Sequence, residues 1–409
     1  MDGGIRMVSL LTRDVRPGAL ARFDPDASRR TINESLAALR EHFDMEVAFV
    51  GRFGHGRRWF EYVSTDASFC PVQPGGSDRL EDSYCARVVD GRAPGLMTDA
   101  REEPSVADLA ATFAMPVGAH LSVPLHLEDG SVFGTLCCFS RQPDPELRER
   151  DLDVLTMVAD VLGGHLGFLL EHEQTFSLAL DRVTGVLAGD GPAMALQPLV
   201  DLRGGRVVGY EALARFPEEA GWTPDRWFAE AGALGLGPQL EGAAVRSALR
   251  LLPDLPPGTS MAVNLSPEAL CSDDRIVDRL ADSSPHRVVV ELTEHARVAY
   301  SQQLTDRLVA LREAGIRIAV DDAGSGYAGL EHILHLGPEV LKLDRVLVQG
   351  IAAHPGRQAM CEAMVRFTQR TGAELVAEGV ETDADLEELR RLGVGLAQGF
   401  LLGRPRLAS

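Results

Sequence analysis

The second half of the chain alternates short apolar runs with stretches of helical pattern. From residue 194 onward eight such runs can be counted: MALQPLVDL, VVGYEALAR, MAVNLS, VVVELTE, RIAVDDAG, VLKLD, ELVAEGVE and GLAQG. Apolar strands that alternate with helices are typical of a β/α fold. Because eight strands can close such a sheet on itself, we expect a TIM-like (β/α)8 barrel.

The first half has a different pattern. A helical segment from Thr31 (INESLAALREHF) is followed by the strand-like runs MEVAFVGRF, WFEYVS, AHLSVPLHLEDG and SVFGTLCCFS. The pair Asp129-Gly130 separates the last two runs, as in a β-hairpin. We therefore expect an α+β domain in which helices flank a central antiparallel sheet.

A helical pattern from about Glu146 to Leu180 leads from the first domain towards the second. Such a helix either transmits a signal between domains or simply closes the first one, and periodicity does not separate these roles. With 409 residues the chain is long enough for two domains and is of the α/β class. The predicted division is a lead-in at 1–30, the α+β domain at 31–172, a helical linker at 173–193 and the barrel at 194–409.

Each apolar run from the second onward ends in a polar residue. In order these are Glu211, Asn264, Glu291, Asp321 with Asp322, Lys342, Glu378 and Gln398. The carboxyl ends of the strands form the active face of such a barrel, so seven strands would deliver polar groups to one mouth. A single carboxylate after a strand is often only a helix cap, but this series predicts a functional site.

The acidic residues among these strand ends predict bound metal. Five carboxylates facing one cavity would repel one another and take up protons unless cations neutralised them. Oxygen ligands with one amide favour Mg²⁺ or Mn²⁺, and the lack of His and Cys at the strand ends argues against zinc.

Net charge narrows the set of partners. The formal charge is −20 at pH 7 and the isoelectric point is about 5.0. This balance excludes a broad basic surface for long nucleic acids and argues against binding to anionic membranes. A small phosphate ester can still bind where local cations reverse the field inside one pocket.

The sequence has the features of a cytoplasmic protein. Its six cysteines show no paired spacing and read as buried, reduced thiols. The N-terminal segment MDGGIRMVSL lacks the pattern of a secretory signal. The longest apolar stretch, 154–170, is interrupted by polar residues and glycines, so it predicts an amphipathic helix rather than a membrane span.

The ordered motifs of the second half resemble the EAL-domain cyclic di-GMP phosphodiesterases. GYEALARF, which contains the signature tripeptide Glu211-Ala212-Leu213, is followed by VNLSP, ELTE, DDAGSGY, KLD, AEGVE and QGFLLGRP in the family's order. The tripeptide alone would carry no weight, but the set covers essentially all of 194–409. The resemblance implies hydrolysis of cyclic di-GMP to linear 5′-pGpG with two divalent ions, Mg²⁺ or Mn²⁺, in each active site.

The same resemblance implies roles for the acidic residues. The family's ligands of the first ion are matched here by Glu211, Asn264, Glu291 and Asp321. Glu211 is also expected to be a catalytic residue. Asp321 would also bind the second ion, and Asp322 would complete the binding site of that ion. Two such ions can activate a water and clamp the scissile phosphate.

Further residues match positions around the substrate. Lys342 would orient the attacking water or stabilise developing charge, and its alternative role is a salt bridge within the acidic rim. Glu378 matches a glutamate that is either a proton acceptor or a ligand acting through water, and both roles stay open. Arg215 resembles the substrate-binding arginine, whose planar fork suits a phosphate or a guanine edge. Gln398 and Gln197 are weaker substrate-binding candidates.

One loop departs from the family pattern. Glu294, in ELTE, resembles the residue that anchors the loop DDAGSGY. Family members commonly have Phe after the paired aspartates, whereas this chain has Ala323. The substitution removes an apolar anchor from that loop and leaves the metal-binding side chains unchanged.

Residues 31–172 resemble a GAF sensory domain, on the segment DSYCARVVDGRAPGLMTDAR and the hairpin LSVPLHLEDGSVFGTLCCFS. GAF domains bind varied small ligands, and the resemblance names none for this chain. Cys85 lacks the following His of bilin-carrying relatives, and His120 reads as a strand histidine rather than a haem ligand. Both resemblances imply a homodimer.

Two other functions stay open. The chain could be a cyclic di-GMP receptor without turnover, or a signalling scaffold whose GAF domain mediates contacts. No GGDEF-like synthase motif is present in the sequence, so synthesis of the dinucleotide is not expected.

Overall fold

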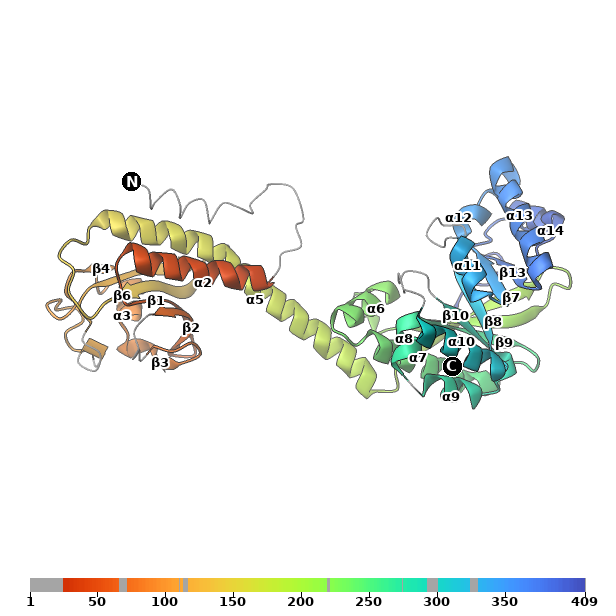
Figure 1. Ribbon diagram of the computed structural model, residues 1–409, viewed down its shortest axis with the longest axis horizontal. Coiled ribbons are helices and arrows are strands. Elements are labelled where there is room, and N and C mark those ends of the chain that lie inside the picture. The colour runs from red at the N-terminus through yellow and green to blue at the C-terminus, as the bar shows by residue number, and fades with distance from the viewer. Residues whose placement is uncertain are drawn as a thin grey trace. The chain divides into compact units, whose positions relative to one another are not determined.

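The computed structural model describes residues 25–65, 72–109, 111–112, 117–218, 221–273, 275–292, 301–323 and 330–408, except for the side chains of 322–323 and 330–332. The chain splits into two compact units, one up to Thr175 and the other from Phe176. Figure 1 labels the elements of both units.

The first unit is built on a six-stranded antiparallel sheet with strand order β3-β2-β1-β6-β5-β4. The strands are β1 Val47–Gly54, β2 Arg57–Thr65, β3 Ser77–Arg79, β4 Leu96–Met97, β5 His120–His126 and β6 Val132–Phe139. Between β5 and β6, Gly130 has a φ of 79°, and its N–H donates to the Leu127 carbonyl at 2.9 Å. The predicted antiparallel sheet and its Asp129-Gly130 hairpin are therefore confirmed.

Helices cover both faces of this sheet. The helix α2 (Pro25–His42) and the first part of α5 (Glu149–Ala188) lie over one face, and α3 (Tyr84–Val89) lies over the other (Figure 1). Successive residues of a strand point to opposite faces. On β6, Cys138 therefore joins the core under α2 and α5, while Cys137 joins the core under α3.

The helix α2 begins earlier than predicted. We expected helix from Thr31 and a lead-in up to residue 30, but α2 starts at Pro25. Proline suits the first turn of a helix, where its missing N–H costs nothing, and Asp26 complements the positive end of the helix dipole. Ser28 is buried in the first turns. Residues 1–24 of the predicted lead-in lie outside the described residues.

The helix α5 is 40 residues long and runs through the division between the units. Its start is stabilised by the Asp151 carboxylate, which accepts the Arg148 N–H at 2.8 Å. An 18-residue window of α5 has a mean hydropathy of 1.4, which by length and composition alone would suffice for a membrane span. Core helices pass the same test, and buried residues of α5 such as Leu155 and Leu162 pack in the first unit's core.

The second unit contains a closed barrel of eight strands, β7 to β14, so the predicted barrel is confirmed. The strands are β7 Ala193–Asp201, β8 Val207–Arg215, β9 Ser260–Leu265, β10 Val288–Leu292, β11 Arg317–Ala323, β12 Val340–Leu343, β13 Glu374–Ala377 and β14 Leu396–Ala397. Strands β8 to β14 pair in parallel and in sequence order. The pairing of β14 with β7 closes the barrel, and β15 (Arg406–Leu407) adds to β7.

One strand departs from the all-parallel arrangement of a TIM barrel. The strand β7 is antiparallel to both of its neighbours in the barrel. Its link to β8 is a tight turn in which Asp201 accepts the N–H groups of Arg203 and Gly204. A parallel pair needs a long crossover, whereas an antiparallel pair needs only such a turn, so this short link dictates the reversal.

Helices surround the barrel (Figure 1). They are α6 Pro224–Ala233, α7 Gly237–Leu251, α8 Pro267–Ser272, α9 Ile276–Ala281, α10 Gln302–Glu313, α11 Leu330–Leu336, α12 Arg345–Val348, α13 Pro355–Thr371 and α14 Asp383–Leu392. Outward-facing strand residues such as Val290, Ile318 and Leu341 form the core with these helices. The inward-facing residues are thereby left to line the lumen.

Candidate active site

The lumen of the barrel has an apolar layer and a polar layer. The apolar layer consists of Leu199, Ala262, Val289, Ala319, Val340, Val376 and Leu396. Since side chains alternate along a strand, the next residue to face the lumen comes two positions later. On the last six strands that residue is polar, namely Asn264, Glu291, Asp321, Lys342, Glu378 and Gln398. Gln197 on β7 pairs with Glu211 on β8 at the same level.

Lys342 lies at the centre of the polar layer. Its Nζ atom is 2.6 Å from Glu378 Oε1 and 2.9 Å from Glu291 Oε2. It is also 3.5 Å from Glu211 Oε2 and 3.5 Å from Asp321 Oδ1. Four carboxylates from four different strands thus converge on one ammonium group.

Side-chain amides fix the position of Glu211. Gln398 Nε2 donates to Glu211 Oε2 at 2.7 Å and to Gln197 Oε1 at 2.9 Å. Asn264 Nδ2 lies 3.3 Å from Glu211 Oε1. Gln197 in turn donates to the carbonyl of Gly403 at 3.1 Å. The two glutamines therefore connect Glu211 to the C-terminal segment of the barrel, and their predicted contact with substrate stays a prediction.

The cluster is buried and short of positive charge. Lys342 is only 2% exposed and Glu291 only 3%. In the described part of the chain these four carboxylates share one ammonium group, so the cluster carries more negative than positive charge when all are ionised. Such an excess in a buried site favours either protonation or the binding of cations.

The pKa values of the cluster show the same shortage. Burial raises the pKa of Glu291 well above its usual range, although Lys342 opposes the shift. Burial likewise raises the pKa of Glu378 to about 8, against the attraction of Lys342. Burial would also raise the pKa of Glu211, but the charge of Lys342 and the hydrogen bond from Gln398 outweigh it and lower that pKa. Lys342 itself is held protonated, because its carboxylate neighbours overcome the effect of burial on its pKa.

The donor set suits a hard divalent cation. Carboxylate oxygens of Glu211, Glu291 and Asp321 lie within 3.5 Å of one atom, and Asn264 adds an amide beside them. Among the described residues, no three acidic, His or Cys side chains form a ready-made metal cage, since the carboxylates turn towards Lys342. The residues present fit a divalent ion in type and charge.

Two adjoining clefts give access to the cluster, and both reach Glu211 and Asp321. The first, of about 310 Å³, is lined by Asn264 and Arg215. The second, of about 240 Å³, is lined by Glu378 and by Arg345, an exposed residue at the start of α12. Sequence reasoning missed Arg345, although it directly follows the KLD motif.

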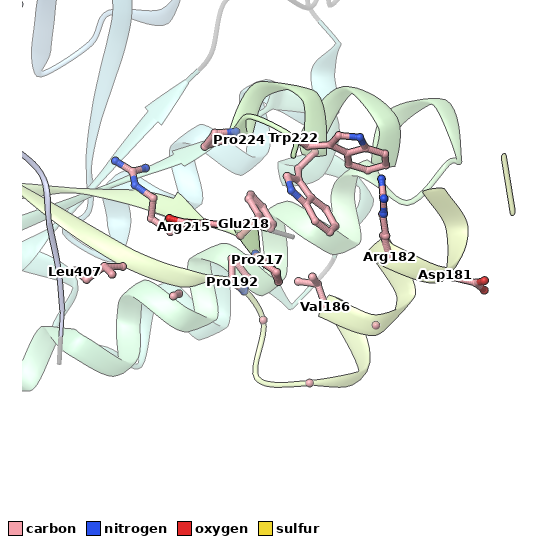
Figure 2. A pocket seen from close by; sticks show the side chains of 16 residues that line it. Asp181, Arg182, Val186, Pro192, Arg215, Pro217, Glu218, Trp222, Pro224 and Leu407 are labelled. Atoms are coloured by element: carbon pink, nitrogen blue, oxygen red, sulfur yellow. The ribbon is translucent and has the colours of Figure 1, made fainter. Parts of the chain in front are cut away.

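Arg215 also reaches a larger cleft of about 1140 Å³ within the second unit, shown in Figure 2. Trp222 lines this cleft. The guanidinium groups of Arg182 and Arg226 lie 4.6 and 5.0 Å from the centre of its indole ring. Arg215 itself donates to the carbonyl of Ala214 at 2.8 Å. Its half-buried position between two clefts is compatible with the predicted contact to substrate.

Some predicted site residues lie wholly or partly outside the described residues. Glu294 and loop residues 324–329 lie outside the described residues, so the anchoring contact stays a prediction. Asp322 belongs to β11, but its side chain and that of Ala323 are not described.

The fold and the site together define an α/β-barrel protein with a buried acidic site at the carboxyl ends of its strands, preceded by a unit built on an antiparallel sheet. The chain belongs to the EAL-domain family, whose model matches residues 182–405. A GAF domain model matches residues 29–166.

Two named phosphodiesterases and one uncharacterized protein are among the similar sequences. The chain is 28% identical to the cyclic di-GMP phosphodiesterase RocR of Pseudomonas aeruginosa over 357 residues, which cover 83% of this chain and 84% of RocR. It is 31% identical to the cyclic di-GMP phosphodiesterase NbdA of the same organism, over 55% of this chain and 30% of NbdA. An uncharacterized protein of Azorhizobium caulinodans is 31% identical over 60% of this chain and 36% of its own length. The chain thus spans about a third of the length of the last two relatives.

Solved structures resemble the barrel. The PaMucR phosphodiesterase in complex with c-di-GMP is 30% identical, with a TM-score of 0.51 over 56% of this chain and 98% of that one. The FimX EAL domain of Xanthomonas citri, in complex with c-diGMP, is 22% identical with a TM-score of 0.52, over 58% of this chain and 97% of that one. The latter similarity supports the fold alone.

Proposed function

We propose that this chain is a phosphodiesterase that hydrolyses cyclic di-GMP to linear 5′-pGpG. Membership of the EAL-domain family supports the proposal, as does the likeness to RocR and to the PaMucR complex. The observation that carries it is the convergence of Glu211, Asn264, Glu291 and Asp321 around Lys342 at the mouth of the barrel.

We propose that Glu211, Asn264, Glu291 and Asp321 hold one divalent ion, and that Asp321 with Asp322 holds a second. The oxygen donors and the excess of negative charge support this assignment. Mg²⁺ and Mn²⁺ are the ions expected from such donors. When bound, they would supply the missing positive charge and polarise both a water molecule and the phosphate.

Lys342 and Glu378 have complementary roles in this proposal. Lys342 holds the carboxylates together and stabilises the negative charge that develops on the phosphate. Glu378 accepts the proton of the attacking water, because its side chain is 19% exposed and borders a cleft. A carboxyl group whose pKa lies near neutrality is suited to this transfer.

We assign substrate binding to the two arginines that line the clefts. Arg215 and Arg345 each border one of the two adjoining clefts. Guanidinium groups bind phosphate oxygens and guanine edges through two parallel hydrogen bonds. Gln398 positions Glu211 through a hydrogen bond and is itself bonded to Gln197. Two arginines in an acidic chain therefore supply the local positive charge that a dianionic substrate needs.

For the rest of the chain we propose a sensory domain at 31–172, a helical linker at 173–193 and the catalytic domain at 194–409. The GAF match supports regulation of the barrel by the first unit, through a ligand yet to be identified and in a homodimer. The described cysteines are all free thiols, which is consistent with the reducing conditions of a cytoplasm.

The test is direct. Full-length protein is incubated with cyclic di-GMP and Mg²⁺ or Mn²⁺, and pGpG is followed by chromatography. We expect turnover that stops on chelation with EDTA and in Glu211→Gln. Glu374→Gln is the matched control, since Glu374 opens β13 at the opposite end of the barrel and pairs with Arg317 at the surface. Binding without product would instead identify a cyclic di-GMP receptor. The absence of any binding would favour a signalling scaffold.

A further inference from the structure

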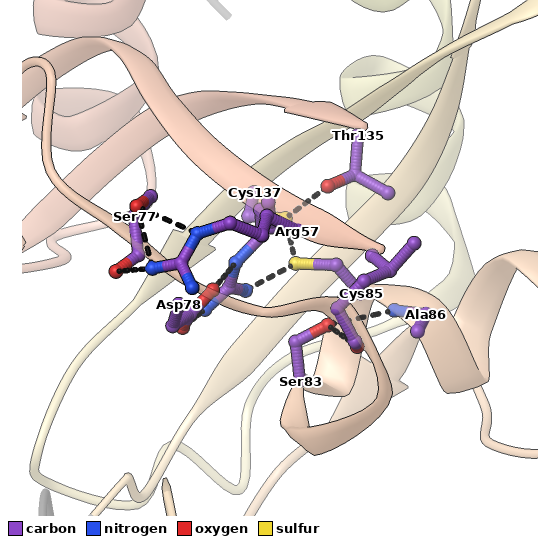
Figure 3. A network of polar contacts seen from close by, with 10 residues as sticks. Arg57, Ser77, Asp78, Ser83, Cys85, Ala86, Thr135 and Cys137 are labelled. Atoms are coloured by element: carbon purple, nitrogen blue, oxygen red, sulfur yellow. Dashed lines mark hydrogen bonds and ion pairs between the residues drawn. The ribbon is translucent and has the colours of Figure 1, made fainter. Parts of the chain in front are cut away.

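The first unit contains a pair of cysteines that its proposed sensory role leaves unexplained. Cys85 on α3 and Cys137 on β6 come from segments far apart in sequence, and their sulfur atoms lie 3.2 Å apart (Figure 3). Both residues are fully buried in the core under α3. The two sulfurs are in contact but unbonded.

A buried guanidinium group faces this pair. Arg58 Nη1 lies 2.9 Å from Cys85 Sγ, and the other edge of the guanidinium donates to the Asp78 carboxylate, with Nε at 3.1 Å from Oδ1. Arg58 is only 7% exposed, and a buried cation requires negative partners. The aromatic rings of Phe49 and Phe60, at 5.6 and 4.7 Å, complete its surroundings. The geometry thus directs a fixed positive charge at the sulfur of Cys85.

The two thiols differ in protonation. Burial raises the pKa of Cys85, but the hydrogen bond from Cys137 and the charge of Arg58 outweigh it and lower that pKa to about 6. Burial raises the pKa of Cys137 well above its usual range. Hydroxyl groups surround Cys137, with Ser122 Oγ at 3.1 Å and Thr135 Oγ1 at 3.2 Å. The charge of Arg58 beside Cys85 therefore favours the thiolate form of Cys85, next to the thiol of Cys137. Thiolate character is one of the properties that make a cysteine open to oxidation.

We propose that Cys85 and Cys137 form an oxidant-responsive site in the first unit, at which a hydroperoxide such as H₂O₂ links the two sulfurs in a disulfide. The Cys85 thiolate attacks one peroxide oxygen and breaks the O–O bond, which gives a sulfenic acid and hydroxide. The Cys137 sulfur then displaces the sulfenic hydroxyl as its own proton goes to that leaving group, so that water departs. The sulfurs are oxidised by two electrons and one peroxide is reduced.

The disulfide would change the environment of Arg58. A bonded sulfur carries no charge, so the buried guanidinium would keep Asp78 as its anionic partner but lose Cys85. The sulfurs need to approach by only about 1.2 Å to reach bonding distance. The bond would tie α3 to β6 at this point. Oxidation is therefore expected to alter the core under α3 and not the core under α2 and α5.

The neighbouring Cys138 provides a matched control. It is as buried as Cys137, but its side chain points to the opposite face of β6, and burial raises the pKa of its thiol. Cys138→Ala should therefore leave the response to peroxide unchanged. Arg58→Gln removes the charge beside Cys85 and should slow the oxidation by roughly tenfold or more at neutral pH.

The experiment treats the reduced full-length protein with H₂O₂ and maps disulfides by mass spectrometry under non-reducing conditions. We expect a peptide pair linked through Cys85 and Cys137, at least tenfold more abundant than in untreated protein and lost on addition of dithiothreitol. The linked peptide is sought in the wild-type chain, so this part of the test does not depend on the folding of any variant. Oxidation confined to other cysteines, a disulfide from Cys85 to a different cysteine, or equal rates in wild type and Arg58→Gln would overturn the proposal. None of these outcomes depends on the chemistry of the barrel.

Discussion

Replacing Lys342 by Met tests whether the acidic cluster depends on one buried charge. The ammonium group is 2% exposed and contacts four carboxylates at 2.6 to 3.5 Å. Removing one partner of a buried ion pair typically costs about 3–5 kcal/mol. Protonation of Glu291 and Glu378, whose pKa values are already raised, would offset part of this. We expect a net loss of about 3 kcal/mol in the metal-free protein, a fall of roughly 6–12 °C in the Tm of the barrel.

Calorimetry of the full-length chain, with and without Mn²⁺, measures this loss. The destabilisation should shrink when Mn²⁺ is present, because divalent ions replace the missing positive charge. Turnover of cyclic di-GMP, measured in the presence of Mn²⁺, should fall by roughly 10²–10³. Leu341→Met is the matched control, since Leu341 is equally buried but faces the helices, and such a swap usually costs less than about 1.5 kcal/mol. A Lys342→Met variant that melts at or above the wild-type temperature without metal would refute the reasoning.

Three further predictions concern other parts of the molecule. Gly163→Ala should destabilise the first unit by about 1–3 kcal/mol, because the new Cβ would collide with the His126 carbonyl. In Gly164→Ala the new Cβ meets no atom within 4 Å, so this variant should stabilise α5 by up to about 1 kcal/mol. Equal melting shifts of the two variants would contradict the packing described for α5. Arg215→Ala should raise KM for cyclic di-GMP by roughly tenfold or more, and Arg215→Lys should restore only part of the wild-type affinity. An unchanged KM would show that Arg215 does not bind the substrate. Oxidation of Cys85 by H₂O₂ should be about tenfold slower at pH 5 than at pH 7, because a thiol whose pKa is about 6 is mostly protonated at the lower pH, and a flat profile would rule out a thiolate.

Much of the barrel could be predicted from the sequence. From the second run onward, each strand is a short apolar run followed by a polar residue, and this pattern follows directly from a lumen that is apolar at one end and polar at the other. Because Glu291 and Lys342 both stand at the carboxyl ends of such runs, the sequence predicts that they meet at one mouth, and their distance of 2.9 Å agrees with this. The period of two along a strand therefore carries information about the site as well as the fold.

The remaining features depend on contacts that a linear pattern does not contain. The reversal of β7 follows from the short link after Asp201, and a count of eight apolar runs contains no information about strand direction. The central position of Lys342 among carboxylates arises from the closure of the barrel. The contact between Cys85 and Cys137 likewise joins segments that only the sheet of the first unit brings together. Periodicity reports which face a residue occupies and not which residue it meets there.

Anomalous diffraction from crystals of the full-length protein grown with Mn²⁺ tests the central claim most directly. The account predicts Mn²⁺ peaks within coordination distance of the side-chain oxygens of Glu211, Asn264, Glu291 and Asp321, at the carboxyl end of the barrel strands. Mn²⁺ found only elsewhere on the surface, with Lys342 still enclosed by the carboxylates, would contradict the account.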